Sequence, residues 1–238
     1  GGKLVAENGK MLHQKEKNTD WSTEIKERVF HSFHRVPITV EELQLKETTG
    51  THQRVIDMVA HELITKERIE EWKELPGVAP GVDISRDIVK LAAIERHKNT
   101  GHVGLGFLGK YGLKKGAVAT SIGHDSHNLV IAGVTDEDMV LAGNRVIENG
   151  GGLAIALEGK VLADLPLPIG GLMADEPVEV VDEKLEHMKK LSVELGISED
   201  IDAFMTLAFI SLPVIPKLRL NTYGVVDVEK HQVVEARF

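Results

Sequence analysis

Apolar and polar residues alternate in short runs along most of the chain, and a clear helical spacing appears only in its second half. Residues 3–12, K-L-V-A-E-N-G-K-M-L, predict two strands joined at the Asn-Gly pair, which favours the tight turns of β-hairpins. Residues 38–45 predict a short strand and a turn, and residues 51–63 predict further strands. Residues 65–72, T-K-E-R-I-E-E-W, open with a cap residue and a charged turn and predict a helix, with no confident helical stripe before them.

The second half carries the stronger signals. Residues 135–149 predict a helix, since Thr135 is a good cap, acids fill the first turn and apolar residues follow at helical spacing. A second helix is expected over residues 176–195, with Asp175 as its cap and Gly196 as its stop. Strands are predicted at residues 88–96, 103–107, 117–122 and 129–134, and a hairpin at 153–165 across Glu158-Gly159.

Residues 75–81, L-P-G-V-A-P-G, are the clearest interruption, and they predict a linker between residues 1–75 and residues 82–238. Strands and helices mix without regular alternation, which argues against a doubly wound sheet. The expected fold class is therefore α+β. We expect a layered α/β sandwich with a mixed or antiparallel sheet, preceded by a small β-rich segment.

Composition narrows the function classes. The chain has 238 residues, a formal charge of −9 and 4% aromatic residues, so phosphate backbones and stacked bases are poor partners. It has no cysteine, which excludes disulfides, zinc–thiolate sites and thiol nucleophiles. The longest apolar run, residues 203–215, is shorter than a membrane helix and contains Pro213. It is expected in the core, and we expect a cytoplasmic protein without a membrane partner.

Two motifs favour ordinary structure over chemistry. Residues 104–110, G-L-G-F-L-G-K, resemble phosphate-binding loops, but no helical stripe follows and Tyr111 stands where magnesium binding needs Ser or Thr. We expect a tightly packed Gly-rich loop there. The histidines of H-S-F-H, His31 and His34, are expected at the surface, because no helical pattern gives them a shared face.

The densest polar cluster lies in residues 120–128, T-S-I-G-H-D-S-H-N. Both flanking segments are strand-like, so His124, Asp125, Ser126 and His127 are expected at the tip of a β-hairpin. On an extended strand the two histidines would point to opposite faces and could not share a metal, whereas in a loop the four side chains could converge. Asp beside His can fix a tautomer and assist proton transfer, but Asp, Ser and Asn also form turns without any chemistry.

Eight segments after the linker form one ordered set: I-E-R-H-K (94–98), G-L-G-F (104–107), G-H-D-S-H-N (123–128), D-E-D-M (136–139), N-R-V-I-E-N-G-G-G (144–152), L-P-L-P-I-G-G-L-M (165–173), D-A-F-M-T-L (202–207) and L-P-V-I-P (212–216). On these segments, the chain resembles the C-terminal region of adenine deaminases of the amidohydrolase superfamily over most of its length after residue 81. Residues 1–75 resemble the remnant of the small β domain that follows the barrel of such enzymes, and residues 82–238 resemble their C-terminal α/β domain.

The resemblance implies hydrolysis of adenine to hypoxanthine and ammonia, with a divalent metal (manganese or iron) that activates water. In this family the metal ligands lie in a (β/α)₈ barrel that opens with H-x-H. This chain has no H-x-H and is too short to hold such a barrel as well, so no metal ligand is transferred to any of its positions. We expect the C-terminal portion of such an enzyme, inactive alone, with adenine and the missing barrel as partners.

Two hypotheses remain for the loop. In the first, it faces adenine at the mouth of the barrel, with His124 and Asp125 nearest the substrate and with Ser126 and His127 supporting them, since these side chains offer donors and acceptors to a purine. In the second, the region is a structural or oligomerisation module, and the loop only fixes a turn or a subunit contact. A homo-oligomer is expected under either hypothesis.

Overall fold

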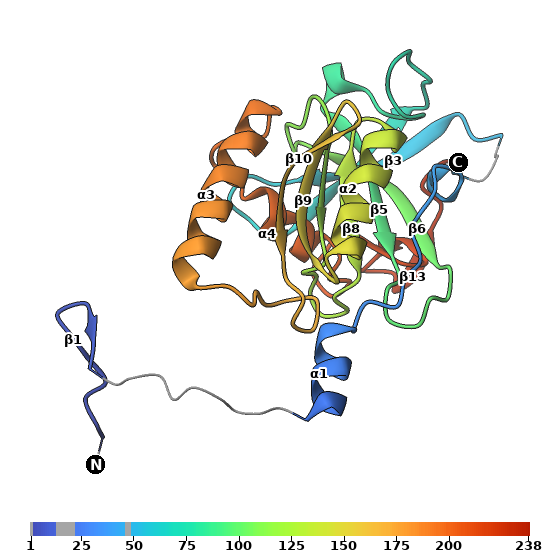
Figure 1. Ribbon diagram of the computed structural model, residues 1–238. Helices are drawn as coiled ribbons and strands as arrows, with labels where there is room; N and C mark the ends of the chain where they lie inside the picture. Colours follow the sequence, from blue (N-terminus) through green and yellow to red (C-terminus); the bar gives the residue numbers. More distant parts are fainter. Residues whose placement is uncertain (1, 13–21, 46–48) are drawn as a thin grey trace.

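The computed structural model describes residues 2–12, 22–45 and 49–238, and an eight-stranded mixed sheet forms its centre (Figure 1). The spatial order of the strands is β10-β9-β7-β8-β5-β6-β3-β4. All neighbours are antiparallel except β3 and β6, which run parallel. The strands are β3 (His52–Met58), β4 (Thr65–Glu71), β5 (Ile88–Ile94), β6 (Val103–Gly109), β7 (Ala117–Thr120), β8 (Leu129–Gly133), β9 (Gly152–Leu157) and β10 (Lys160–Pro166).

Helices and a small sheet cover the two faces of the central sheet. Helix α2 (Asp136–Glu148) packs on one face, against β7, β8, β9 and β10. The opposite face carries α3 (Val178–Glu194), α4 (Ala203–Ile210) and a three-stranded sheet. That small sheet consists of β11 (Leu218–Asn221), β12 (Gly224–Asp227) and β13 (Gln232–Val234). The fold is therefore a layered α+β sandwich with a mixed sheet, as predicted.

Two apolar clusters fill the space between these layers. On β7, Ala117 and Ala119 join the cluster under α2, whereas Val118 joins the cluster on the opposite face. Successive strand residues point to opposite faces, so a central strand covered on both faces must be apolar throughout. This explains the continuous apolar runs of the central strands. Burying them supplies most of the driving force for folding.

Several predicted elements are confirmed. The N-terminal Asn-Gly pair joins β1 (Ala6–Glu7) to β2 (Lys10–Met11) in a small separate sheet. Thr135 caps α2, because its hydroxyl accepts the N–H of Asp138. The predicted strands after residue 81 form β5 to β8, and β9 and β10 form the predicted hairpin. The apolar run at residues 203–215 contains α4, which lies largely in the core.

The helix predicted at residues 65–72 is wrong, because that segment forms β4. Its residues pair with β3 from His52↔Glu71 to Met58↔Thr65, and Arg54 forms an ion pair with Glu67 across the two strands. Cross-strand pairing thus overrides a local helical preference.

Three smaller expectations also fail. Helix α1 (Thr23–Phe30) was not predicted, since it has no buried residue and so no apolar stripe, but Ser22 caps it. The strand expected in residues 38–45 is instead the 3₁₀ turn η1 (Glu41–Leu43), which lets Leu43 reach the core beside α2. Helix α3 begins after Pro177 rather than after Asp175.

The Gly-rich motif is part of strand β6 and not a loop, although the predicted close packing is confirmed. A β-carbon on Gly104 would lie 1.8 Å from the carbonyl oxygen of Asn221, at the end of β11. A β-carbon on Gly109 would lie 2.0 Å from Oδ1 of Asp57. These glycines therefore permit close approach of neighbouring strands and leave no room for a phosphate.

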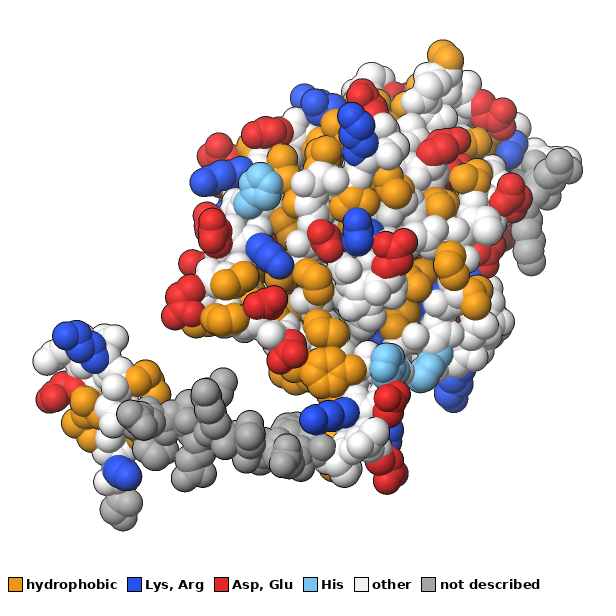
Figure 2. All heavy atoms as spheres, viewed as in Figure 1, with side chains coloured by type: hydrophobic (Ala, Val, Ile, Leu, Met, Phe, Trp, Pro, Cys, Tyr) orange, Lys and Arg blue, Asp and Glu red, His pale blue; other side chains and the backbone are white. Residues whose placement is uncertain are grey.

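Residues 75–81 lead from β4 to the 3₁₀ turn η2 (Ile84–Arg86), and strands on both sides of them belong to the same sheet. The division of the chain into residues 1–75 and 82–238 stays a prediction. On the side of the molecule that Figure 2 shows, acidic and basic side chains are interspersed with apolar ones. In the described part of the chain, no helix has the length and apolar character needed to cross a membrane.

Candidate functional site

The H-D-S-H segment connects β7 to β8, as predicted. These strands pair from Ala117↔Gly133 to Thr120↔Val130, so residues 121–128 form the loop of a hairpin. Asp125 and Ser126 are exposed at its tip, and His124 and His127 are half-buried. The loop therefore presents two accessible polar side chains flanked by two histidines.

Neighbouring backbone holds the loop at both histidines. The N–H of His124 donates to the carbonyl oxygen of Ala208 in α4 at 3.0 Å, and the N–H of His127 donates to that of Gly123 at 2.7 Å. The imidazole of His124 packs on the ring of Phe209, with 4.6 Å between ring centroids. His127 has a φ of 47°, a left-handed conformation that non-glycine residues adopt in tight turns.

A buried arginine anchors the other side of the loop. Arg96 follows β5, is 1% exposed, and donates from Nε to the carbonyl oxygen of His127 at 2.5 Å. Its two terminal nitrogens donate to the carbonyl oxygens of Ser32 (3.4 Å) and Gly170 (3.0 Å). The guanidinium also lies 4.9 Å from the centre of the Phe33 ring. Arg96 thus joins the loop to two other segments of the chain.

The residues on either side of Arg96 extend this network. Nε2 of His97 lies 2.7 Å from the carbonyl oxygen of Ser126, so this nitrogen must carry a proton and donate it. The carboxylate of Glu95 accepts the N–H groups of His97, Lys98 and Thr100. Burial alone would raise the pKa of Glu95, but these N–H groups outweigh it and lower the pKa to about 2.

Burial and charge disfavour protonation of His127 in the loop. Burial lowers the pKa of His127 below its ordinary value, and the electrostatic effects of Arg96, His124 and His97 act in the same direction. Asp125 opposes them with a smaller effect. Burial also lowers the pKa of Arg96 to about 10, which leaves it cationic at neutral pH. The described residues provide no hydrogen-bond partner for the buried Nδ1 of His127.

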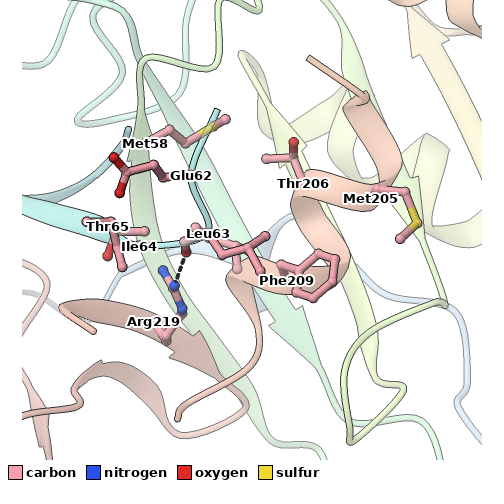
Figure 3. A pocket seen from close by; sticks show the side chains of 10 residues that line it. Met58, Glu62, Leu63, Ile64, Thr65, Met205, Thr206, Phe209 and Arg219 are labelled. Atoms are coloured by element: carbon pink, nitrogen blue, oxygen red, sulfur yellow. Dashed lines mark hydrogen bonds between the residues drawn. The ribbon is translucent and has the colours of Figure 1, made fainter. Parts of the chain in front are cut away.

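A pocket of about 200 Å³ lies between α4 and the segment that leads from β3 to β4 (Figure 3). Phe209 links the pocket to the loop, since its ring lines the pocket and contacts His124. Leu63 and Met205 at the rim are 52% and 42% exposed. Arg219 at the base donates to the carbonyl oxygen of Leu63, as the dashed line in Figure 3 marks. The pocket is largely apolar and offers a purine few donors or acceptors.

The structure brings the four predicted site residues together in one loop, and their contact with a substrate stays a prediction. Sequence reasoning missed the anchoring roles of Glu95, Arg96 and His97. One signal was available, because E-R-H follows directly after a wholly apolar predicted strand. A charged triplet at the end of a buried strand is expected to bind neighbouring loops, but the identity of those loops needs the fold. The histidines His31 and His34 are exposed, as predicted.

The described residues do not fit a catalytic metal, since they contain no group of three or more His, Asp or Glu side chains placed to hold one. Two histidines in and beside the loop already have other contacts. The imidazole of His124 packs on Phe209, and Nε2 of His97, which follows β5, is directed at the carbonyl oxygen of Ser126. No step through a metal is therefore assigned to these residues.

Comparison with known proteins gives one consistent result. Residues 62–232 match the model of the adenine deaminase C-terminal domain family. The chain is 43% identical over 234 residues to adenine deaminase 2 of Carboxydothermus hydrogenoformans, which covers 98% of this chain and 40% of that protein. It is 39% identical over 235 residues to an adenine deaminase of Lysinibacillus sphaericus, which covers 98% and 39%. An adenine deaminase of Kosmotoga olearia is 43% identical over 232 residues, covering 98% and 39%.

The chain thus spans about two fifths of the length of these relatives. The family match covers most of the central sheet, α2, α3, α4 and the H-D-S-H loop. With this fold and this match, the chain belongs to the adenine deaminase C-terminal domain family.

Proposed function

We propose that this chain is the C-terminal portion of an enzyme that hydrolyses adenine to hypoxanthine and ammonia, and that its His124–His127 loop faces the substrate. The names of the relatives support the reaction. Because the described residues do not fit a metal, we propose that a divalent metal is held by the longer polypeptide outside this chain. On this proposal the 238-residue chain alone does not deaminate adenine.

One observation carries the role of the loop: its backbone is fixed while its tip stays exposed. Ala208, Arg96 and His97 bind the backbone of the loop from two separate elements. The side chains of Asp125 and Ser126 nevertheless remain exposed. Functional side chains are most effective when a rigid framework holds them in place before the substrate arrives.

The chemistry of the loop suits a neutral purine. Adenine presents ring nitrogens that accept hydrogen bonds and an amino group that donates them. We propose that Asp125 accepts from the purine and that His124, stacked on Phe209, donates to a ring nitrogen. Ser126 and His127 support them, and the buried Nδ1 of His127 has no partner among the described residues, so it is directed inward and not at the purine.

Substitution of His124 by Ala in the longer metal-loaded enzyme tests the proposal. We expect kcat/KM for adenine to fall about 10²-fold, the scale on which misplaced or missing substrate contacts act. His187→Ala is the matched control, because His187 is an exposed histidine on α3, away from the loop. Unchanged kcat and unchanged KM in His124→Ala would refute the substrate-facing role.

A structural role is the second candidate, and the anchoring itself favours it. Arg96 joins the loop to the segments around Ser32 and Gly170, an arrangement that would also fix a domain or a subunit contact. In this case His124→Ala would leave turnover unchanged but would change the oligomeric state. Size-exclusion chromatography with light scattering on the same variant separates the two candidates.

A further inference from the structure

Arg96 is a buried cation with an unusual set of partners. The described residues place no carboxylate within ion-pair distance of its guanidinium, although its neighbour Glu95 is acidic. Its three nitrogens are instead directed at carbonyl oxygens of His127, Ser32 and Gly170. An unpaired buried charge is costly, so a fold that retains one needs strong compensating hydrogen bonds.

The three carbonyl groups come from three different parts of the chain. Ser32 follows α1, His127 lies in the hairpin loop, and Gly170 lies between β10 and α3. The planar guanidinium presents five N–H donors in a fixed arrangement, so it can hold three separate segments at set angles. A lysine carries the same charge but lacks this geometry.

Two features around Arg96 fix its position. Gly171 has a φ of 74°, and a β-carbon there would lie 2.7 Å from Nη1 of Arg96, so a larger residue would be strained and would displace the guanidinium. The hydroxyl of Ser121, at the start of the loop, donates to the carbonyl oxygen of Gly171 at 2.6 Å. The first part of the hairpin loop and the Gly170–Gly171 segment are therefore tied together around the same side chain.

We infer that Arg96 is the positioning residue of the His124–His127 loop: its guanidinium sets the backbone at His127 and thereby the orientation of the exposed Asp125 and Ser126. This inference rests on the proposed function for its effect on catalysis, but its effect on the loop is independent of that function. Arg96 is buried and lies behind the loop, so it does not touch the substrate.

The pH response of His127 reports on this arrangement. The charged or titratable groups that act on its imidazole are Arg96 and His97 beyond β5, and His124 and Asp125 in the loop. Of these groups, Arg96 has the largest electrostatic effect on the pKa of His127, and it lowers that pKa. Removing the cation should therefore raise the pKa of His127, whereas a lysine that keeps the charge should raise it less.

The first experiment uses the 238-residue chain. Histidine ring resonances are titrated by NMR in the wild type and in the variants Arg96→Met, Arg96→Lys and Arg219→Met. Arg219 is the matched control, since it is also buried and also bonded to carbonyl groups, but it does not contact the loop. We expect the His127 titration to move to higher pH in Arg96→Met, and to stay unchanged in Arg219→Met. An unchanged His127 titration in folded Arg96→Met overturns the inference.

The second experiment measures adenine hydrolysis by the longer metal-loaded enzyme with the same substitutions. We expect Arg96→Met to lower kcat about 10²-fold and to shift the acid limb of the pH profile, with partial recovery in Arg96→Lys. Arg219→Met should retain kcat within about threefold, a difference of less than one kcal/mol in barrier height. Equal losses in Arg96→Met and Arg219→Met overturn a positioning role, because loss of stability alone would then explain both.

The two experiments separate the inference from the proposed function. If His124→Ala does not affect turnover while the His127 titration still moves in Arg96→Met, the substrate-facing role fails and Arg96 remains the anchor of the loop. If His124→Ala lowers turnover and the His127 titration does not move, the proposed function stands and the inference about Arg96 fails.

Discussion

A buried arginine that donates to backbone carbonyl groups occurs in two regions of this fold, at Arg96 and at Arg219. Both arginines are almost wholly buried, both donate to backbone carbonyl groups, and burial lowers the pKa of each to about 10. Two of the acceptors of Arg219, on Leu218 and Pro216, lie within three residues of it. The three carbonyl acceptors of Arg96 are 31 to 74 residues away. Its third acceptor, on Leu63, lies 156 residues away from Arg219, just before β4. Arg219 thus combines two local contacts with one distant contact, whereas all three carbonyl acceptors of Arg96 lie in distant segments, one of them in an exposed polar loop.

The difference teaches what a buried cation can contribute besides stability. Around Arg219 the anchored group, Leu63, belongs to an apolar rim (Figure 3). Around Arg96 the anchored group is the loop that carries Asp125 and Ser126. Both arrangements stabilise the fold, but the second also holds a loop whose polar side chains are exposed.

The largest expected effect concerns stability, where the two regions should behave alike. Arg96→Met leaves the carbonyl groups of His127, Ser32 and Gly170 without this donor, and Arg219→Met does the same to that of Leu63, whereas Leu218 and Pro216 keep donors from Thr65. Each substitution also removes a buried side chain's hydrogen bonds and should lower the free energy of unfolding by about 2–4 kcal/mol. Urea denaturation of the two variants and the wild type measures this. A loss of stability in only one of the two variants would show that the hydrogen bonds of the two arginines do not contribute equally.

A pair of neighbouring glycines tests the packing around Arg96. Gly171→Ala should cost about 2–3 kcal/mol, since it combines a φ of 74° with a β-carbon 2.7 Å from Nη1 of Arg96. Gly170→Ala is the control, because its φ of 68° carries similar strain while no atom lies within 4 Å of the new β-carbon. It should cost about 1 kcal/mol. Thermal unfolding of both variants measures the difference in stability. Equal losses would show that the Arg96 side chain moves aside without a further loss of stability.

Glu95 should make the Arg96 region sensitive to acid. Its pKa is about 2 in the folded chain and near 4.5 when unperturbed, so its stabilising effect is complete above about pH 4.5 and is lost as the pH falls towards 2. Glu95→Gln should cost about 1–2 kcal/mol at pH 7. The loss should shrink as the pH falls through this window. Denaturation at several pH values checks it, and a loss independent of pH would exclude the carboxylate as its cause.

The smallest expected effect lies where the two regions meet. Phe209 contacts His124 on one side and lines the pocket above Arg219 on the other. Phe209→Leu keeps an apolar side chain and removes the ring contact, which is worth about 1 kcal/mol. We expect the His124 ring resonances to shift and those of His127 to stay nearly unchanged. A larger change in the ring resonances of His127 than in those of His124 would mean that α4, rather than Arg96, sets the conformation of the loop.

Sequence reasoning reached most of the architecture because periodicity and turn residues act locally. The cap at Thr135, the hairpin across Glu158-Gly159 and the H-D-S-H loop could all be read from neighbouring residues. The β4 strand could not, since its charged residues become strand residues only when Asp57 and Arg54 of β3 lie opposite them. The role of Arg96 was inaccessible for the same reason, because its partners are distant in sequence.

Ammonia release from adenine tests the central claim most directly, measured side by side for three proteins, each supplied with the divalent metal. These are the 238-residue chain, the longer polypeptide that contains it, and the longer polypeptide with His124→Ala and Asp125→Ala. We predict rapid ammonia release by the unaltered longer polypeptide and none by the 238-residue chain. In the double variant the release should be slower by about 10²-fold or more. Turnover by the 238-residue chain, or equal turnover in the double variant, would contradict the account.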